Sequence, residues 1–304
     1  MVTNTISLQK PENLFSGLGR MIGAELIKLS KRQMTKVLLG ILIGIIALVN
    51  LILLAISKAN LPANAGDRLG NVQNLLGLPA AIPFALALMT TFGIVLAIIL
   101  TASSVGNEYN WRTIRTALIS SESRFKFLTA KLVSLGILIL IGMAIGVVTG
   151  FIMGLITTAL GGYAFNFSFA TGSYFWDQFL QFWRTFYMIM PFSLLAFLMA
   201  IVGRSAMPGI ATGIGVVFLE TIITAFMRLA GGWIAKVPDY LLNTNVNVIT
   251  ALNKLPRGFG MGIGNGGTSD ALPTLPHAFI TLGIYSVAFL ALGFYLFRKR
   301  DVTG

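Results

Sequence analysis

The hydrophobic positions of this chain fall into six long runs separated by polar segments. The runs lie near Val37–Ile56, Ala80–Ala102, Leu132–Ile156, Phe186–Val202, Gly209–Ala230 and Ala278–Phe297. A helix needs about 20 residues to cross the hydrocarbon core of a bilayer, and the runs approach or exceed that length. They are continuous, whereas the strands of a membrane barrel would alternate apolar and polar residues. The pattern predicts an all-α membrane protein with a six-helix transmembrane domain over residues 37–304.

The segment before the first run, residues 1–36, has a helical pattern of its own. Its apolar stripe consists of Leu14, Leu18, Met21, Ile22, Leu26 and Leu29, at spacings of three and four residues. Other faces carry the basic residues Arg20, Lys28, Lys31 and Arg32. This predicts an amphipathic interfacial helix over residues 14–35, lying in the plane of the lipid head groups. The alternative is an ordinary solvated leader. The segment is too polar for a signal peptide, so the first run is expected to remain as an anchor.

Composition and charge support a membrane setting. Of the 304 residues, 56% are hydrophobic and only 11% are charged, against about 25% in soluble domains. The net charge of +12 comes from bases that flank the apolar runs, a distribution typical of contact with anionic lipid and not of nucleic-acid binding. Fifteen Lys and Arg residues fall on the side that holds both termini, and seven on the other. This excess predicts cytoplasmic termini.

The sequence has few candidates for chemistry. It contains no GxxxxGK[ST] phosphate loop, no HExxH or GxSxG motif and no cysteine, so we expect no enzymatic activity and no metal or cofactor in this chain. The single histidine, His277, is expected at the outer membrane interface. Glu220 lies in the middle of the fifth run, where an ionisable group is costly. It either lines a substrate or ion pathway or makes a hydrogen bond between helices. The other interpretation is a protonated or locally paired glutamate that only helps the helices pack.

The outer loop, residues 231–277, combines two kinds of sequence. Residues 233–255 mix apolar and polar positions and predict one or two short helices at the outer membrane surface. The following GFGMGIGNGG, residues 258–267, predicts a connector without fixed structure.

The cytoplasmic loop, residues 103–131, carries the most ordered polar sequence, GNEYNWRTIRTALISSESRFKFLTAKL over Gly106–Leu132. It resembles the loop E-Y-x-W-x-T-x-R-T-x-L, then S-R-x-x-F-L-x-A-K-L, of the permease subunits of type-2 ABC exporters. Two further stretches agree with that family. Ala24–Gln33, with Glu25 and Lys28, is similar to its E-L-x-K-L-x-[KR]-[KR] entry, and Tyr295–Val302 resembles its F-x-[KR]-R-D-[IVL] ending.

The resemblance implies the ABC type-2 exporter fold in a cell membrane, expected to be a bacterial plasma membrane. It also implies a second permease, either a copy of this chain or a sister chain, and separate P-loop ATPase subunits. The loop would be a coupling helix that docks on the ATPase. The residues expected to carry this coupling are Glu108, Tyr109, Trp111, Arg112, Thr113, Arg115, Thr116, Arg124, Phe127 and Lys131.

The residue types support such an interface independently. Charged residues of a water-facing helix, including Glu108, Arg112 and Arg115, can form intermolecular ion pairs. Tyr109, Trp111 and Phe127 would supply aromatic anchors of the kind that dominate interfaces. The other interpretation is that these aromatic residues belong to the membrane-interface belt and that the arginines are positive-inside anchors.

The sequence therefore leaves three functions open. The first is the permease subunit of an ATP-driven exporter, contacting ATPase subunits and membrane lipids. The second is a self-sufficient secondary transporter or channel that uses Glu220. The third is a membrane scaffold or sensor without transport.

Overall fold

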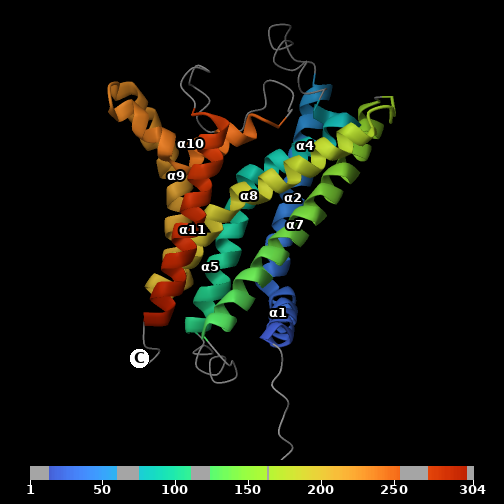
Figure 1. Ribbon diagram of the computed structural model, residues 1–304. Helices are drawn as coiled ribbons and strands as arrows, with labels where there is room; N and C mark the ends of the chain where they lie inside the picture. The colour runs from blue at the N-terminus through green and yellow to red at the C-terminus, as the bar shows by residue number, and fades with distance from the viewer. Residues whose placement is uncertain (1–13, 60–74, 111–123, 163, 254–272, 300–304) are drawn as a thin grey trace, which may run out of the picture.

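The computed structural model describes residues 14–59, 75–110, 124–162, 164–253 and 273–299 (Figure 1). The regular structure of these residues is helical. The helices are α1 (Leu14–Lys31), α2 (Gln33–Lys58), α4 (Leu78–Leu88), the π-helix η2 (Met89–Gly93), α5 (Ile94–Asn110), α7 (Arg124–Gly161), α8 (Gly172–Gly203), α9 (Ala206–Ala230), the 3-10 helix η3 (Ile234–Tyr240), α10 (Leu242–Thr250) and α11 (Leu275–Lys299). The all-α prediction is confirmed for the described residues.

Within the described residues, six helices are long and apolar enough to cross a membrane, and each contains one of the predicted runs. The second span joins α4, η2 and α5 into one unit, Leu78–Tyr109. Both α1 and the last turn of α11 lie at the lower end of the bundle in Figure 1, called here the α1 end. This shared end agrees with an even number of crossings between them.

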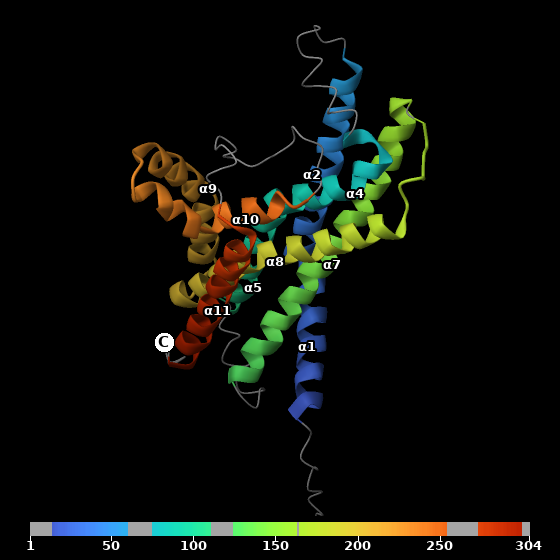
Figure 2. The same ribbon diagram turned by 45° about the horizontal axis from the view of Figure 1, so that its top comes forward.

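The fourth span differs most from its predicted extent. Helix α8 begins at Gly172 rather than near Phe186, because Thr171 caps its first turn by accepting a hydrogen bond from the backbone N–H of Tyr174. The added turns are rich in aromatic residues. At 1.5 Å per residue the helix is about 48 Å long, well over the roughly 30 Å of a hydrocarbon core. In Figures 1 and 2 it crosses the bundle obliquely.

The predicted amphipathic helix before the first span is confirmed as α1, although it ends at Lys31. At Arg32 the backbone turns to an extended conformation with ψ 133°, and α2 begins at the next residue. The Thr35 hydroxyl crosses this joint and donates to the Leu29 carbonyl over 2.7 Å. Leu29 is fully buried, so the apolar stripe of α1 packs against protein. Figure 2 shows α1 below α2 along the same side of the bundle.

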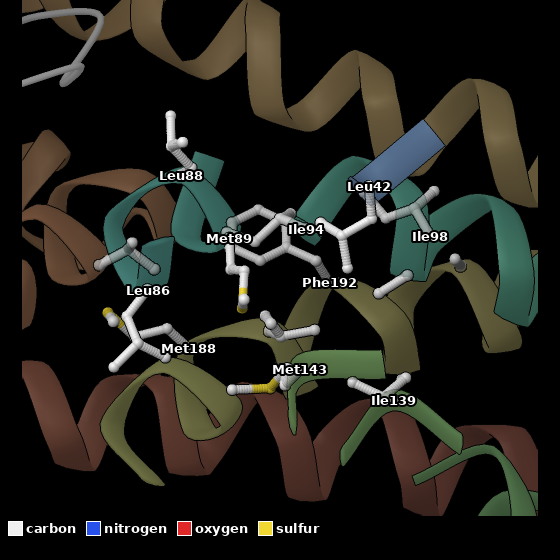
Figure 3. Packing of buried hydrophobic residues seen from close by; sticks show 14 of the residues in the cluster. Leu42, Leu86, Leu88, Met89, Ile94, Ile98, Ile139, Met143, Met188 and Phe192 are labelled. Atoms are coloured by element: carbon white, nitrogen blue, oxygen red, sulfur yellow. The ribbon is translucent and has the colours of Figure 1, made fainter. Parts of the chain in front are cut away.

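The core of the bundle lies where the second and fourth spans meet α7. Met89, Ile98 and Phe192 are almost completely buried there and point toward one another (Figure 3). By contrast, α9 and α11 leave most of their apolar side chains at the surface. Such faces are expected where helices contact lipid or another subunit.

Helix α7 approaches α4 through a row of glycines that the sequence analysis did not single out. Gly146, Gly150 and Gly154 recur every four residues, the small-residue spacing that brings membrane helices together. A Cβ atom added to Gly150 would lie 2.3 Å from the Cβ of Ala85, and one added to Gly154 would lie 2.4 Å from that of Ala81. The two helices therefore meet nearly backbone to backbone.

The outer loop contains the short helices that its mixed pattern predicts, namely η3 and α10. Helix α10 does more than lie at a surface, because Asn245 and Ile249 are completely buried against the bundle. The glycine-rich stretch 258–267 lies outside the described residues.

Candidate functional site

Four charged side chains meet at the α1 end and form what we call the charge network: Glu25 and Lys28 of α1, Glu108 of α5 and Lys131 of α7. Lys131 Nζ lies 2.7 Å from Glu25 Oε1 and 2.7 Å from Glu108 Oε1. Lys28 Nζ lies 2.5 Å from Glu108 Oε1 and 3.5 Å from Glu25 Oε2. Among the described residues, two acids and two bases thus pair across three helices.

The network is buried on one side and open on the other. The side chains of Lys131 and Glu108 are 1% and 2% exposed, whereas that of Lys28 is 41% exposed. Lys131 therefore supplies the buried cation, and Lys28 closes the network toward solvent. Helix α1 is tied to α7 a second time by the Ser134 hydroxyl, which donates to the Ile22 carbonyl over 3.1 Å.

The position of Glu25 within α1 explains how a carboxylate enters this contact. Glu25 lies three residues after Ile22 and four before Leu29, so it shares the packed face of the helix. Burial raises the pKa of Glu25, but the adjacent Lys131 and, to a lesser extent, Lys28 outweigh that effect and hold the pKa below its ordinary value. Glu25 is therefore ionised at neutral pH.

The structure corrects part of the predicted coupling surface. Glu108 does not face water, because it is buried and its carboxylate is satisfied within the chain. Phe127 is not an exposed anchor, because its ring is buried and stacks on Phe297 of α11 with the centroids 6.4 Å apart. Tyr109 is partly buried against the core, and Lys131 is buried in the network.

The other predicted coupling residues are Arg124 and five residues of the segment between α5 and α7. Arg124 is the first residue of α7. Trp111, Arg112, Thr113, Arg115 and Thr116 lie outside the described residues, and their coupling role stays a prediction. Glu25 and Lys28, predicted on the interfacial helix, belong to the charge network instead of standing apart from the loop motif.

Glu220 makes the hydrogen bond between helices that was one of its predicted roles. Its side chain is buried and accepts hydrogen bonds from the backbone N–H groups of Asn243, over 2.5 Å, and Thr244. Those groups belong to the first turn of α10, where unpaired N–H groups and the helix dipole favour a carboxylate. The Asn243 side chain donates back to the Val217 carbonyl over 2.7 Å. Glu220 therefore caps α10 and fastens it to α9.

His277 also makes contacts within the protein. Its Nε2 lies 3.0 Å from the Asp239 carbonyl oxygen, and its ring meets that of Tyr240 edge to face with the centroids 5.1 Å apart. These contacts join the start of α11 to η3 and agree with the predicted interface position.

Comparison with known proteins identifies relatives of this chain. The chain is 29% identical over 217 residues to "Uncharacterized protein YhcI" of Bacillus subtilis (strain 168), a match that covers 68% of this chain and 63% of that protein. The match thus spans less than two thirds of the relative's length.

A family match covers a larger part of the chain. The family described as "Protein of unknown function (DUF2705)" matches residues 63–303, a region that includes Glu108, Lys131 and Glu220 but not α1 or α2. Because this match covers well over half of the sequence, the chain belongs to the DUF2705 family.

Proposed function

We propose that this protein is the membrane-spanning permease subunit of an ATP-driven ABC exporter of the type-2 family. In this proposal the segment 111–123 docks on a separate P-loop ATPase, and the spans form the substrate pathway with a second permease. The sequence supports the proposal through three ordered motifs, and the described residues support it through six apolar helices of spanning length.

One observation carries the proposal: all three motif segments meet at the α1 end. The charge network joins Glu25 of the first motif to Glu108 and Lys131 of the second. The third motif contributes Phe297, whose ring stacks on that of Phe127 near the start of α7. Residues that are far apart in the sequence are thus packed around the two helix ends that flank segment 111–123.

This arrangement suits the transmission of force. A partner that moves segment 111–123 would displace the end of α5 and the start of α7. Because Lys131 bonds to Glu25 as well as Glu108, the displacement would also reach α1. The ion pairs are buried and short, so they couple the three helices more stiffly than solvated surface pairs would.

The secondary-transporter alternative receives no comparable support. Its central residue, Glu220, has its carboxylate bonded to backbone N–H groups of α10. That use of the carboxylate is structural. A scaffold without transport remains distinguishable by experiment.

The test is isolation of the full chain, affinity-tagged at its native locus, followed by mass spectrometry of its partners. We expect a P-loop ATPase to co-purify, and its activity in proteoliposomes to depend on this chain. Arg115→Glu should abolish both effects without lowering the melting temperature. The matched control is Arg204→Glu, an exposed charge reversal in the α8–α9 turn at the same end, which should leave the complex intact. Wild-type protein that retains no ATPase would refute the proposal.

A further inference from the structure

An apolar cavity of about 100 Å³ opens between α2, the second span and α7. Its lining includes Leu38, Leu42, Leu96, Leu100, Leu138 and Gly142. Among the described residues that line it, Thr35 alone has a polar side chain. A polar ligand would lose its hydrogen bonds to water in such a space, so the cavity favours a hydrocarbon group.

Two features of the backbone create the space. The second span changes to a π-helix at Met89–Gly93, and both of these residues line the cavity. Opposite them, Gly142 of α7 has no side chain, and a Cβ atom built there would meet nothing within 4 Å. Lining residues on the second span run from Met89 to Leu100, about 16 Å along a helix, so the cavity is elongated along the bundle.

The cavity opens on the outer surface of the bundle. Ile141, one of its lining residues, is 48% exposed, as expected at a rim. The surrounding helices are three of the spans, so the opening faces the region that a bilayer would fill. A lipid chain can enter from there without passing through water.

Positive charge gathers at the Thr35 end of the cavity. Lys31, Arg32 and Lys36 all lie within four residues of Thr35, at the joint between α1 and α2. Lys31 and Lys36 are exposed, and the first turn of α2 contains no acidic residue. The nearest acid of α1, Glu25, is already paired with Lys131. Basic groups in this position attract an anionic head group.

We propose that this cavity and joint form a binding site for an anionic glycerophospholipid. Part of one acyl chain lies in the cavity between α2, α5 and α7, and the phosphate contacts Lys31 and Lys36. The site does not involve segment 111–123 or Glu220, so it stands whether or not the chain is a transporter. It gives the α1–α2 joint a specific lipid partner.

The first test measures lipid binding to the purified, delipidated full chain in neutral detergent. Phosphatidylglycerol and phosphatidylcholine with the same acyl chains are added in turn, and the melting temperature and the bound lipid are recorded, the latter by native mass spectrometry. We expect phosphatidylglycerol to bind and to raise the melting temperature, and phosphatidylcholine to do so more weakly. Gly142→Leu should abolish both effects by filling the cavity.

Gly136→Leu is the matched control, because Gly136 is also a half-buried glycine of α7 with open space at its Cβ but does not line the cavity. It should bind lipid like the wild type. Since the chain has no cysteine, Gly142→Cys provides a gentler probe with a single thiol. Phosphatidylglycerol should slow its alkylation by a maleimide several-fold and leave that of Gly136→Cys unchanged.

The second test addresses the head group. The double variant Lys31→Gln/Lys36→Gln should lose the preference for phosphatidylglycerol, whereas Arg298→Gln/Lys299→Gln, which removes two exposed bases from the same end of the bundle, should keep it. Equal binding of both lipids by the wild type would overturn the proposal. So would undiminished binding to Gly142→Leu, unprotected alkylation of Gly142→Cys, or an equal loss of preference in the two double variants.

Discussion

Replacing Lys131 with methionine removes the cation that two buried carboxylates share. Methionine keeps a long unbranched stem, so Lys131→Met deletes the charge with little change in packing. Glu25 and Glu108 then lose a partner that lies 2.7 Å from each of them. Of the described bases paired with these acids, Lys28, which is 41% exposed, then remains beside both of them.

The size of the effect follows from burial and distance. At an effective dielectric constant of about 20, two unit charges 2.7 Å apart attract by about 6 kcal/mol before desolvation is subtracted. Removing one partner of a buried ion pair typically costs about 3–5 kcal/mol, because the remaining charge stays buried. For a chain of this size the melting temperature should fall by on the order of 10 °C. Scanning fluorimetry of the purified chain in neutral detergent measures this shift.

The loss should also depend on pH. In the wild type the pKa of Glu25 is lowered, so the stability it contributes is present at neutral pH and is lost as pH falls through that lowered pKa. Of the two lysines that lower the pKa of Glu25, Lys28 remains in Lys131→Met to oppose the effect of burial. Protonation of Glu25 then removes the unpaired charge from the variant. The difference in melting temperature between Lys131→Met and the wild type should therefore become smaller from pH 8 to pH 5.

Two further variants separate charge from packing. The triple variant Glu25→Gln/Glu108→Gln/Lys131→Met leaves no unpaired buried charge and should recover most of the loss. Lys58→Met, at the exposed far end of α2, should change stability by less than about 0.5 kcal/mol. The reasoning is refuted if Lys131→Met melts with the wild type, or if the triple variant is no more stable than the single one.

Two other predictions concern helix contacts. Gly150→Ala places a methyl group into the close approach of α7 to α4 and should lower the free energy of unfolding by about 1–3 kcal/mol. Gly136→Ala, where a Cβ meets open space, should leave it unchanged. Thermal unfolding compares the two variants, and equal melting temperatures would contradict the glycine contact. Glu220→Ala should uncap α10 and cost about 1 kcal/mol, whereas Glu220→Gln keeps an acceptor for the Asn243 N–H. Hydrogen exchange of the α10 amides tests this, and equal loss of protection in both variants would show that charge matters more than the hydrogen bond.

Hydropathy was sufficient to place the six spans but not to bound them. The first run, Val37–Ile56, is easy to recognise because nearly every residue in it is apolar. Helix α8 shows why ends are harder: Trp176, Asp177 and Arg184 lower the local hydropathy although the helix is continuous through them. Turns of a helix that extend beyond the hydrocarbon core still form their backbone hydrogen bonds, but their side chains need not be apolar. Their boundaries therefore depend on caps such as Thr171, which hydropathy does not register.

The charge network was predictable residue by residue but not as a network. Glu25, Lys28, Glu108 and Lys131 each belong to a motif, yet the sequence places Glu25 and Lys131 in different segments and says nothing of their contact. One signal was present: Glu25 interrupts the apolar face of α1, and an acid on a packed face requires a buried base. The same rule applies to Glu108, because a carboxylate at the end of a span can find its partner on a neighbouring helix.

The network constrains how the α1 end can move, whatever the partner is. Lys131 bonds to acids on two different helices, so sliding of α7 past α5 or α1 would leave a buried charge unpaired. Such a rearrangement would cost several kcal/mol, about as much as breaking a buried pair. A motion delivered through segment 111–123 should therefore carry the end of α5, the start of α7 and α1 together as one body. We expect that body to turn relative to the first span at Arg32, where the backbone is extended between α1 and α2.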